Sequence, residues 1–346
     1  MTRFFFLSVS LLLALEVSAL VQQDFTLTGK ISGVQKGDTL RFERILYPGF
    51  VKEAAFDIIV EKPDLFSYSG KQDHDQEYIM TYLPKEGLTP DCDRVGRDFI
   101  VTDGDNINFS GKVNEIYYCT LGGGIYRDSL FSRMLQLEDS VGIVRSSYLT
   151  KMNEATARKD TVSAMQYLKL FNNFGRAGSE PVIDRYHEAR KAYAEARPEG
   201  SIYLLVNALQ KISYTPVEEA RSLYDSWSQD LRDSYYGQIY AKELSKVEQL
   251  AEGQQVPGFS VTTTDSIRIA EDDYRGKYLL IYHWGMCPGS LQIDSMVRDL
   301  YDRYSDKGLE VLGMTESLAQ IREVHDGLSE KEKYQLPGVD LSLIHI

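Results

Sequence analysis

Cys287 is the residue of this 346-residue chain whose type and position best suit covalent chemistry. It lies in the segment Tyr282-His283-Trp284-Gly285-Met286-Cys287-Pro288-Gly289-Ser290, after an apolar run and before a pattern typical of a helix. A thiol at a helix start lies near unpaired backbone N–H groups and the positive end of the helix dipole, and both lower its pKa. We therefore predict that Cys287 is a nucleophilic thiolate.

Ser290 limits what this thiol can do, because it occupies the position of the second cysteine in a Cys-x-x-Cys pair. A single thiol can attack a disulfide, but nothing else in the motif can release the mixed disulfide that results. We expect Ser290 to hydrogen-bond the thiolate, Pro288 to occupy the first helical turn and Trp284 to shield the site. Two interpretations of His283 stay open: a ring that supports the thiolate, or an imidazole on a strand with no role.

The other two cysteines, Cys92 and Cys119, both lie in the N-terminal part of the chain. If they form a disulfide, Cys287 is left as the free thiol, which suits a working nucleophile in an oxidising compartment. Equally, Cys119 could be a small buried residue beside Tyr117 and Tyr118. The sequence leaves both possibilities open.

The chain is acidic, since 38 lysine and arginine residues against 51 aspartate and glutamate residues give a formal net charge of −13. This charge argues against binding to phosphate backbones, so we expect no nucleic-acid partner. A composition with 43% hydrophobic and 26% charged residues is typical of folded domains. Oligomeric state does not follow from these values.

Residues 1–19 have the pattern of a cleavable signal peptide. Arg3 precedes a charge-poor apolar stretch at 4–15, and the small residues Ser18 and Ala19 suit cleavage after Ala19. The stretch is too short for a spanning helix, and no cysteine near the cut offers a lipid anchor. We expect a periplasmic or secreted protein without a stable membrane span; a buried N-terminal helix is the alternative.

Residues 20–125 have the pattern of a β-rich domain. Alternating or apolar runs between turn residues predict strands at 25–31, 40–46, 55–60, 77–83 and 99–109, the last run broken by a turn at Asp103-Gly104-Asp105. This spacing favours a small antiparallel sandwich or barrel. Asp73-His74-Asp75 could hold a metal, but we interpret the histidine as solvated surface. The run Gly122-Gly123-Gly124 lacks the signature of a phosphate loop and is interpreted as a flexible hinge.

Residues 126–250 change to helical spacing and predict about five helices that link the flanking regions. The segment Thr215-Pro216-Val217-Glu218 has the form of a capping box with proline at the first helical position, so we expect a helix to start there.

Residues 251–346 have an α/β pattern. The apolar run at 278–282 predicts a strand buried on both faces, and residues 291–304 predict an amphipathic helix that Gly308 terminates. A further strand is predicted at 309–314, which gives a parallel strand–helix–strand crossover. The whole chain is therefore predicted to be multidomain, with a signal peptide, an antiparallel β domain, a helical region and an α/β domain.

Residues 253–340 resemble the thioredoxin-like domains of envelope thiol–disulfide oxidoreductases, which are often grouped with the alkyl hydroperoxide reductase/thiol-specific antioxidant family. The resemblance is carried by Gly253-x-x-Val256-Pro257-x-Phe259, Arg275-Gly276-Lys277, the strand into Trp284 and Cys287-Pro288-Gly289-Ser290. It implies a thioredoxin-like fold, no cofactor and no metal, and thiol-bearing or disulfide-bearing proteins or small thiols as partners. The N-terminal region resembles a domain of unassigned function (DUF4369-like) that precedes such modules in envelope proteins.

These observations predict a thiol–disulfide oxidoreductase of monothiol type that acts through mixed disulfides. Two alternatives stay open: a redox-silent thioredoxin-fold binding module and, with less support, a thiol peroxidase. The residues after about 324 are too few for the remaining strand pair and covering helix, so we expect a C-terminally incomplete domain. Residues 341–346 resemble translated sequencing-adapter read-through, which predicts that the natural protein continues differently after about Asp340.

Overall fold

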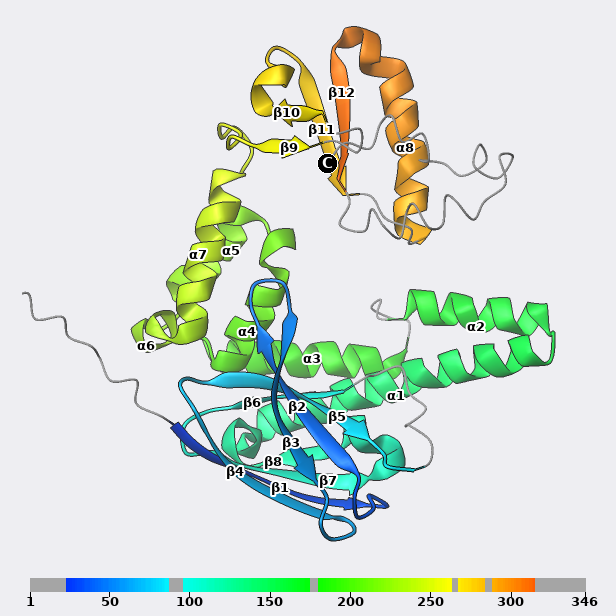
Figure 1. Cartoon of the computed structure of the whole chain (residues 1–346), viewed down its shortest axis with the longest axis vertical. Coiled ribbons are helices and arrows are strands. Elements are labelled where there is room, and N and C mark those ends of the chain that lie inside the picture. The colour runs from blue at the N-terminus through cyan, green and yellow to red at the C-terminus, as the bar shows by residue number, and fades with distance from the viewer. Residues whose placement is uncertain (1–22, 87–95, 175–179, 263–266, 284–287, 315–346) are drawn as a thin grey trace, which may run out of the picture. The chain divides into compact units, whose positions relative to one another are not determined.

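The computed structural model describes residues 23–86, 96–174, 180–262, 267–283 and 288–314 of the chain. Contacts divide it into two compact units, Met1–Ala251 and Glu252–Ile346 (Figure 1). The predicted signal peptide and the residues after 314 lie outside the described part. Among the helices within the described ranges, none combines the length and apolar character needed to cross a bilayer.

The first unit begins with two four-stranded sheets. Their strands are β1 (Gln23–Ser32), β2 (Thr39–Leu46), β3 (Val51–Ile59), β4 (Leu65–Gln72), β5 (Gln76–Leu83), β6 (Arg97–Val101), β7 (Asn106–Lys112) and β8 (Thr120–Gly122). One sheet has the order β4-β1-β7-β8 and the other β3-β2-β5-β6. The predicted antiparallel β region is confirmed, with one difference: β1 and β7 pair in parallel.

The two sheets enclose one apolar core because their strands alternate between inward and outward side chains. In β1, Phe25 and Leu27 are buried whereas Thr28 is exposed. Phe99 of β6 and Phe109 of β7 meet edge to face across the sheets, with ring centroids 5.0 Å apart. Such ring pairs stabilise the core beyond the effect of burying their apolar area, and they favour one arrangement of the rings.

Seven α-helices and short 3-10 turns follow within the described part of this unit. The helices are α1 (Ser129–Ala157), α2 (Thr161–Asn173), α3 (Pro181–Glu195), α4 (Ile202–Lys211), α5 (Val217–Ser226), α6 (Gln229–Asp233) and α7 (Tyr235–Gln249). The predicted helical region is confirmed. The helix start near 216 is also observed, but Pro216 is the N-cap residue and no side chain caps α5, so the expected capping box does not form.

The strands and helices of this unit share their cores. Phe131 and Met134 of α1 belong to the same buried cluster as the strand residues. The Tyr236 hydroxyl of α7 accepts a hydrogen bond of 2.8 Å from the Glu77 backbone N–H in β5. The β-rich and helical regions therefore pack as one body; their predicted boundary at 125 stays a prediction.

The Gly122-Gly123-Gly124 run is a close-packed junction, which corrects its interpretation as a hinge. Gly123 has a φ of 81°, and a Cβ there would lie 1.7 Å from the Asn106 carbonyl oxygen. Its own carbonyl accepts a 2.9 Å hydrogen bond from the Tyr126 N–H.

We predict that Gly123→Ala lowers the free energy of unfolding by about 2 kcal/mol, because strain and a backbone clash add together. The control is Gly104→Ala, where φ is 71° but no atom lies within 4 Å of the added Cβ. This change should cost only about 1 kcal/mol. Urea denaturation of both variants measures the difference, and equal losses would show that the close approach to Asn106 costs nothing.

The second unit contains two pairs of strands. Strands β9 (Ser260–Thr262) and β10 (Arg268–Ala270) form an antiparallel hairpin, while β11 (Tyr278–His283) and β12 (Leu309–Met314) are parallel and connected by α8 (Pro288–Tyr304). The predicted crossover is thus observed. The expected burial of 278–282 on both faces is wrong at Tyr278 and Ile281, which are 75% and 43% exposed. Within the described residues β11 has only β12 as a neighbour, so less of it is covered.

Candidate active site

The segment that carries Cys287 lies in the chain between the first strand and the helix of the crossover in the second unit. Strand β11 ends at His283, which pairs with Met314 of β12, and helix α8 begins at Pro288. Pairing starts at the other end of β11, where the Tyr278 N–H donates a 2.9 Å hydrogen bond to the Gly308 carbonyl. The segment 284–287 therefore connects the carboxyl end of a strand to the amino end of a helix.

The sequence explains why α8 occupies these positions. Proline at the first helical position has a φ already suited to a helix and lacks only an N–H that would be unpaired there. Val297 in the third turn is buried, whereas Met296 beside it is exposed, as expected for an amphipathic helix. The helix ends in a short 3-10 turn followed by Gly308 at a φ of 89°, a left-handed conformation that favours glycine.

The predicted site residues fall into two groups. His283 ends β11, and Pro288 and Ser290 lie in the first turn of α8. The backbone places these three at the two ends of the connecting segment, but their side chains lie outside the described part. Cys287 and Trp284 fall within 284–287, also outside the described residues, so their predicted roles are untested.

The predicted disulfide between Cys92 and Cys119 is likewise untested, because Cys92 lies in 87–95, outside the description. Cys119 follows the 3-10 turn Val113–Tyr118 and is 2% exposed. It lies close enough to Arg97 for an electrostatic interaction between the two side chains. Among the described residues, no three or more His, Cys, Asp or Glu side chains lie together so that they could hold a metal ion.

The ring of His74 packs against a helix and is only partly exposed, which corrects its interpretation as solvated surface. It is half-buried, and its ring stacks on Tyr235 of α7 with centroids 3.5 Å apart and planes 7° from parallel. Its Nδ1 lies 2.7 Å from the Asp75 carbonyl oxygen. This histidine joins a loop of the β region to α7.

A buried ion pair between β6 and α1 was missed by sequence reasoning. Both guanidinium Nη atoms of Arg97 donate hydrogen bonds to the Asp139 carboxylate, one of them at 3.0 Å. Arg97 is 1% exposed and Asp139 is 8% exposed. Burial acts to lower the pKa of Arg97, but the charge and hydrogen bonds of Asp139, together with other nearby groups such as Asp98, outweigh it and raise the pKa. An arginine two residues before the apolar run 99–101 is the signal that could have indicated this pair.

A second buried polar group is Glu77 in β5, which is 5% exposed. The Tyr47 hydroxyl donates a 2.6 Å hydrogen bond to its carboxylate and itself accepts one of 2.7 Å from the Gln210 amide of α4. Burial raises the pKa of Glu77 to about 7, and nearby Asp98 acts in the same direction, whereas the Tyr47 hydrogen bond only partly opposes them. The carboxyl thus titrates near neutral pH at the junction of strands and helices.

Curated proteins similar to this chain include two that share one name. The thiol-disulfide oxidoreductase ResA of Bacillus cereus (strain ATCC 10987 / NRS 248) is 29% identical over 77 residues. The thiol-disulfide oxidoreductase ResA of Bacillus thuringiensis subsp. konkukian (strain 97-27) is 27% identical over 77 residues. Each alignment covers 22% of this chain and 44% of the relative, so the chain spans less than half the length of these curated relatives.

The predicted resemblance of the N-terminal region to a domain of unassigned function stays a prediction. The predicted resemblance of the C-terminal region is confirmed at the family level. Residues 252–339 match the model of the AhpC/TSA family, and they contain the β11–α8–β12 crossover.

Proposed function

We propose that this protein is a thiol–disulfide oxidoreductase whose nucleophile is Cys287. The observation that carries the proposal is the place of this cysteine in the chain, in the segment that follows the carboxyl end of the parallel strand β11 and directly before the first residue of α8. The family match over 252–339 and the names of the two similar proteins support the same class of reaction.

The chemistry is a disulfide exchange through one thiol. The Cys287 thiolate attacks one sulfur of a partner disulfide, a new S–S bond forms, and the other partner sulfur leaves as a thiolate. A second thiol then attacks the partner sulfur of this mixed disulfide, which forms a new partner disulfide and returns Cys287 as a thiolate. Ser290 cannot perform the second step because it has no sulfur, so a separate thiol molecule or protein must supply it.

The elements around the segment 284–287 suit this role. The first-turn N–H groups of α8 and its helix dipole favour the thiolate over the thiol. Ser290 would donate a hydrogen bond to the thiolate, while Trp284 would cover it and His283 would add a nearby cation when protonated. The signal-peptide pattern of residues 1–19 supports a location in the cell envelope, where partner disulfides persist.

The test is the reactivity of Cys287 in the full chain. We expect its alkylation rate to rise through a pKa below the ordinary thiol value of about 8.5. We also expect Cys287→Ser to abolish mixed disulfides with a small aromatic disulfide, whereas Cys119→Ala, a change at a buried site, leaves them unchanged. Mass spectrometry of the adduct identifies the residue.

A gain-of-function variant completes the test. Ser290→Cys should form an intramolecular disulfide with Cys287 and resolve mixed disulfides without an added thiol. If Cys287 reacts only above pH 8 and forms no adduct, the redox-silent binding module is the better description. If hydroperoxide converts it to a sulfenic acid faster than disulfides react, a thiol peroxidase is favoured.

A further inference from the structure

Glu77 of β5 lies on a sheet face that helices cover. In the antiparallel pairing of β5 with β6, Glu77 stands opposite Ile100, and Asp98 lies two residues from Ile100 on the same face. Ile100 belongs to a buried cluster with Val206 of α4 and Leu244 of α7. The carboxyl of Glu77 is therefore enclosed between the strands and the helices that pack on them.

A cavity of about 100 Å³ lies beside Glu77, between this sheet face and helices α1 and α4. Three carboxyl groups line it, those of Glu77, Asp98 and Glu138. None of the described residues in its lining is a lysine, an arginine or a histidine. A negative charge on Glu77 would therefore meet two further acidic groups and no cation inside the cavity.

The carboxylate and the backbone of Glu77 contact different helices. The Tyr47 hydroxyl donates to the carboxylate at 2.6 Å and accepts from the Gln210 amide of α4 at 2.7 Å. The Tyr236 hydroxyl of α7 instead accepts from the Glu77 backbone N–H at 2.8 Å and from the Gln76 amide at 3.2 Å. Neither of these two donors titrates. A change of charge on Glu77 therefore acts on the contact with α4 and leaves the contact with α7.

The tyrosines around Glu77 do not titrate between pH 5 and pH 8. Burial raises the pKa of each of them above the ordinary value of 10. They are Tyr47 of β2, Tyr126 of the 3-10 turn before α1, Tyr203 of α4 and Tyr236 of α7. Their hydroxyls form hydrogen bonds, but they supply no charge that could compensate that of Glu77 in this range.

The charged groups on the surrounding elements do not neutralise Glu77 either. Glu43 of β2 lies on the same sheet face and is itself acidic. The guanidinium of Arg97 is held in its buried ion pair with α1. Lys211 of α4 interacts electrostatically with Arg190 of α3 and with an acidic residue of α1. All three of these cations lie outside the lining of the cavity.

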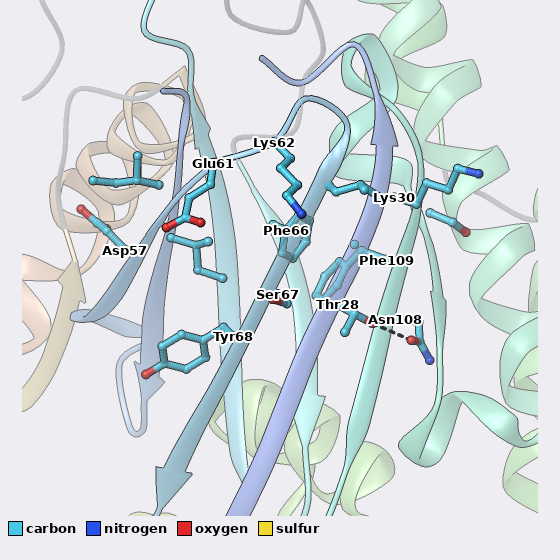
Figure 2. Close-up of a pocket in the computed structure, with 15 residues that line it drawn as sticks. Thr28, Lys30, Asp57, Glu61, Lys62, Phe66, Ser67, Tyr68, Asn108 and Phe109 are labelled. Carbon is cyan, nitrogen blue, oxygen red and sulfur yellow. Dashed lines mark hydrogen bonds between the residues drawn. The ribbon is translucent and has the colours of Figure 1, made fainter. Parts of the chain in front are cut away.

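The larger groove of the first unit differs from this cavity in its charged groups. Its volume is about 1020 Å³. Its charged lining residues are all exposed: Lys30, Asp57, Glu61 and Lys62 (Figure 2). Charges of both signs that water already hydrates contribute little to stability. Titration in this groove therefore leaves the packing beneath it unchanged, in contrast to titration of the buried Glu77.

We propose that the contact between α4 and the β5–β6 face is a pH-sensitive joint, which opens when Glu77 releases its proton to the solvent while α7 stays in place. The protonated carboxyl is neutral and suits the closed cavity. The carboxylate carries a charge that burial and the neighbouring acidic groups disfavour, and a movement of α4 away from the strands lets water hydrate it. This joint does not depend on the thiol chemistry proposed for Cys287.

The expected size of the effect follows from the pKa of Glu77 in the two states. Burial raises it from the ordinary value of 4.5 to about 7 in the closed state, and contact with water in the open state returns it to the ordinary value. The proton therefore stabilises the closed state at low pH, and this contribution is lost as pH rises from about 4.5 through 7. Between pH 6 and pH 8 the ratio of open to closed molecules should rise about tenfold.

Hydrogen exchange followed by mass spectrometry tests the joint in the full chain, because exchange reports local opening. The natural chain and Glu77→Gln are compared at each pH, so that the pH dependence of chemical exchange cancels. From pH 6 to pH 8, the exchange rate of α4 in the natural chain should rise about tenfold relative to the variant, whereas the relative rate of α7 stays unchanged. A constant relative rate in α4, or an equal rise in α7, would overturn the proposal.

Two further variants locate the effect at the cavity, with α7 of the same chain as the reference. Asp98→Asn removes a charge that raises the pKa of Glu77, so the rise in α4 exchange between pH 6 and pH 8 should be smaller than in the natural chain. The control Glu195→Gln changes a side chain in α3 that is 67% exposed, and it should leave this rise unchanged. If Glu77→Gln does not fold, the comparison with Asp98→Asn decides. A rise in Asp98→Asn as large as that in the natural chain would reject the proposal.

Discussion

Replacing Asp139 with alanine is expected to lower the free energy of unfolding by about 3–5 kcal/mol. The change leaves the Arg97 guanidinium in an interior site where it is 1% exposed and has lost both hydrogen bonds to the Asp139 carboxylate. Arg97 Nε already has no hydrogen-bond partner among the described atoms, so little else satisfies the charge. Urea denaturation of the full chain, followed by circular dichroism, measures the loss.

The matched control is Glu195→Ala, which removes an exposed ion pair with Lys191 whose side chains are 67% and 76% exposed. We expect this control to change stability by less than about 0.5 kcal/mol, since solvent screens such pairs. The double variant Arg97→Met with Asp139→Leu should recover most of the stability, because no buried charge remains. An Asp139→Ala loss no larger than that of the control would show that Arg97 reaches water.

The second large effect is a dependence of stability on pH that originates at Glu77. Burial raises its pKa from the ordinary value of 4.5 to about 7 in the folded protein, so the folded state holds the proton more tightly. An acid whose pKa is raised stabilises the fold while it is protonated, and this contribution is lost as pH rises from about 4.5 through 7. Between pH 5 and pH 8 we expect a loss of about 2–3 kcal/mol from this group.

The comparison with Glu77→Gln isolates this group from the other carboxyls. The glutamine side chain keeps the shape of glutamate and can accept the hydrogen bond from the Tyr47 hydroxyl, but it does not titrate. The free energy of unfolding of this variant should therefore change less between pH 5 and pH 8 than that of the natural chain. Tyr47→Phe removes the donor that favours the charged carboxylate, so the pH-dependent loss should move to higher pH. Parallel stability curves for the natural chain and Glu77→Gln from pH 5 to pH 8 would contradict the assignment.

Local patterns predicted the parts of the fold that are decided locally. The alternation in β1, the strand at Leu309–Met314 and the terminating Gly308 all follow from short-range periodicity and backbone preference. Strand β4 was missed because its sequence, Leu65-Phe66-Ser67-Tyr68-Ser69-Gly70, is rich in serine and glycine. It is a strand because it pairs along its length with β1, and such pairing overrides intrinsic preference.

Contacts that join distant segments could not be predicted from the sequence. The parallel pairing of β1 with β7, the Arg97–Asp139 pair and the stacking of His74 on Tyr235 each depend on a partner at least 42 residues away. For the candidate site, the sequence predicted a strand that ends at Tyr282, one residue before the observed end at His283, and a first helical turn at Pro288, because both are marked by local residue types. It could not predict the side-chain geometry around Cys287, which depends on packing between separate elements.

The hydrogen bond from the Glu77 backbone N–H to the Tyr236 hydroxyl also orders events during protein synthesis. The two residues are 159 positions apart, so β5 leaves the ribosome long before its partner on α7 exists. Until that helix emerges, the strands cannot complete this contact, and chains halted before Tyr236 should be recognised by chaperones or degraded. Because α7 ends at Gln249, the region that carries Cys287 is translated after both partners of this contact.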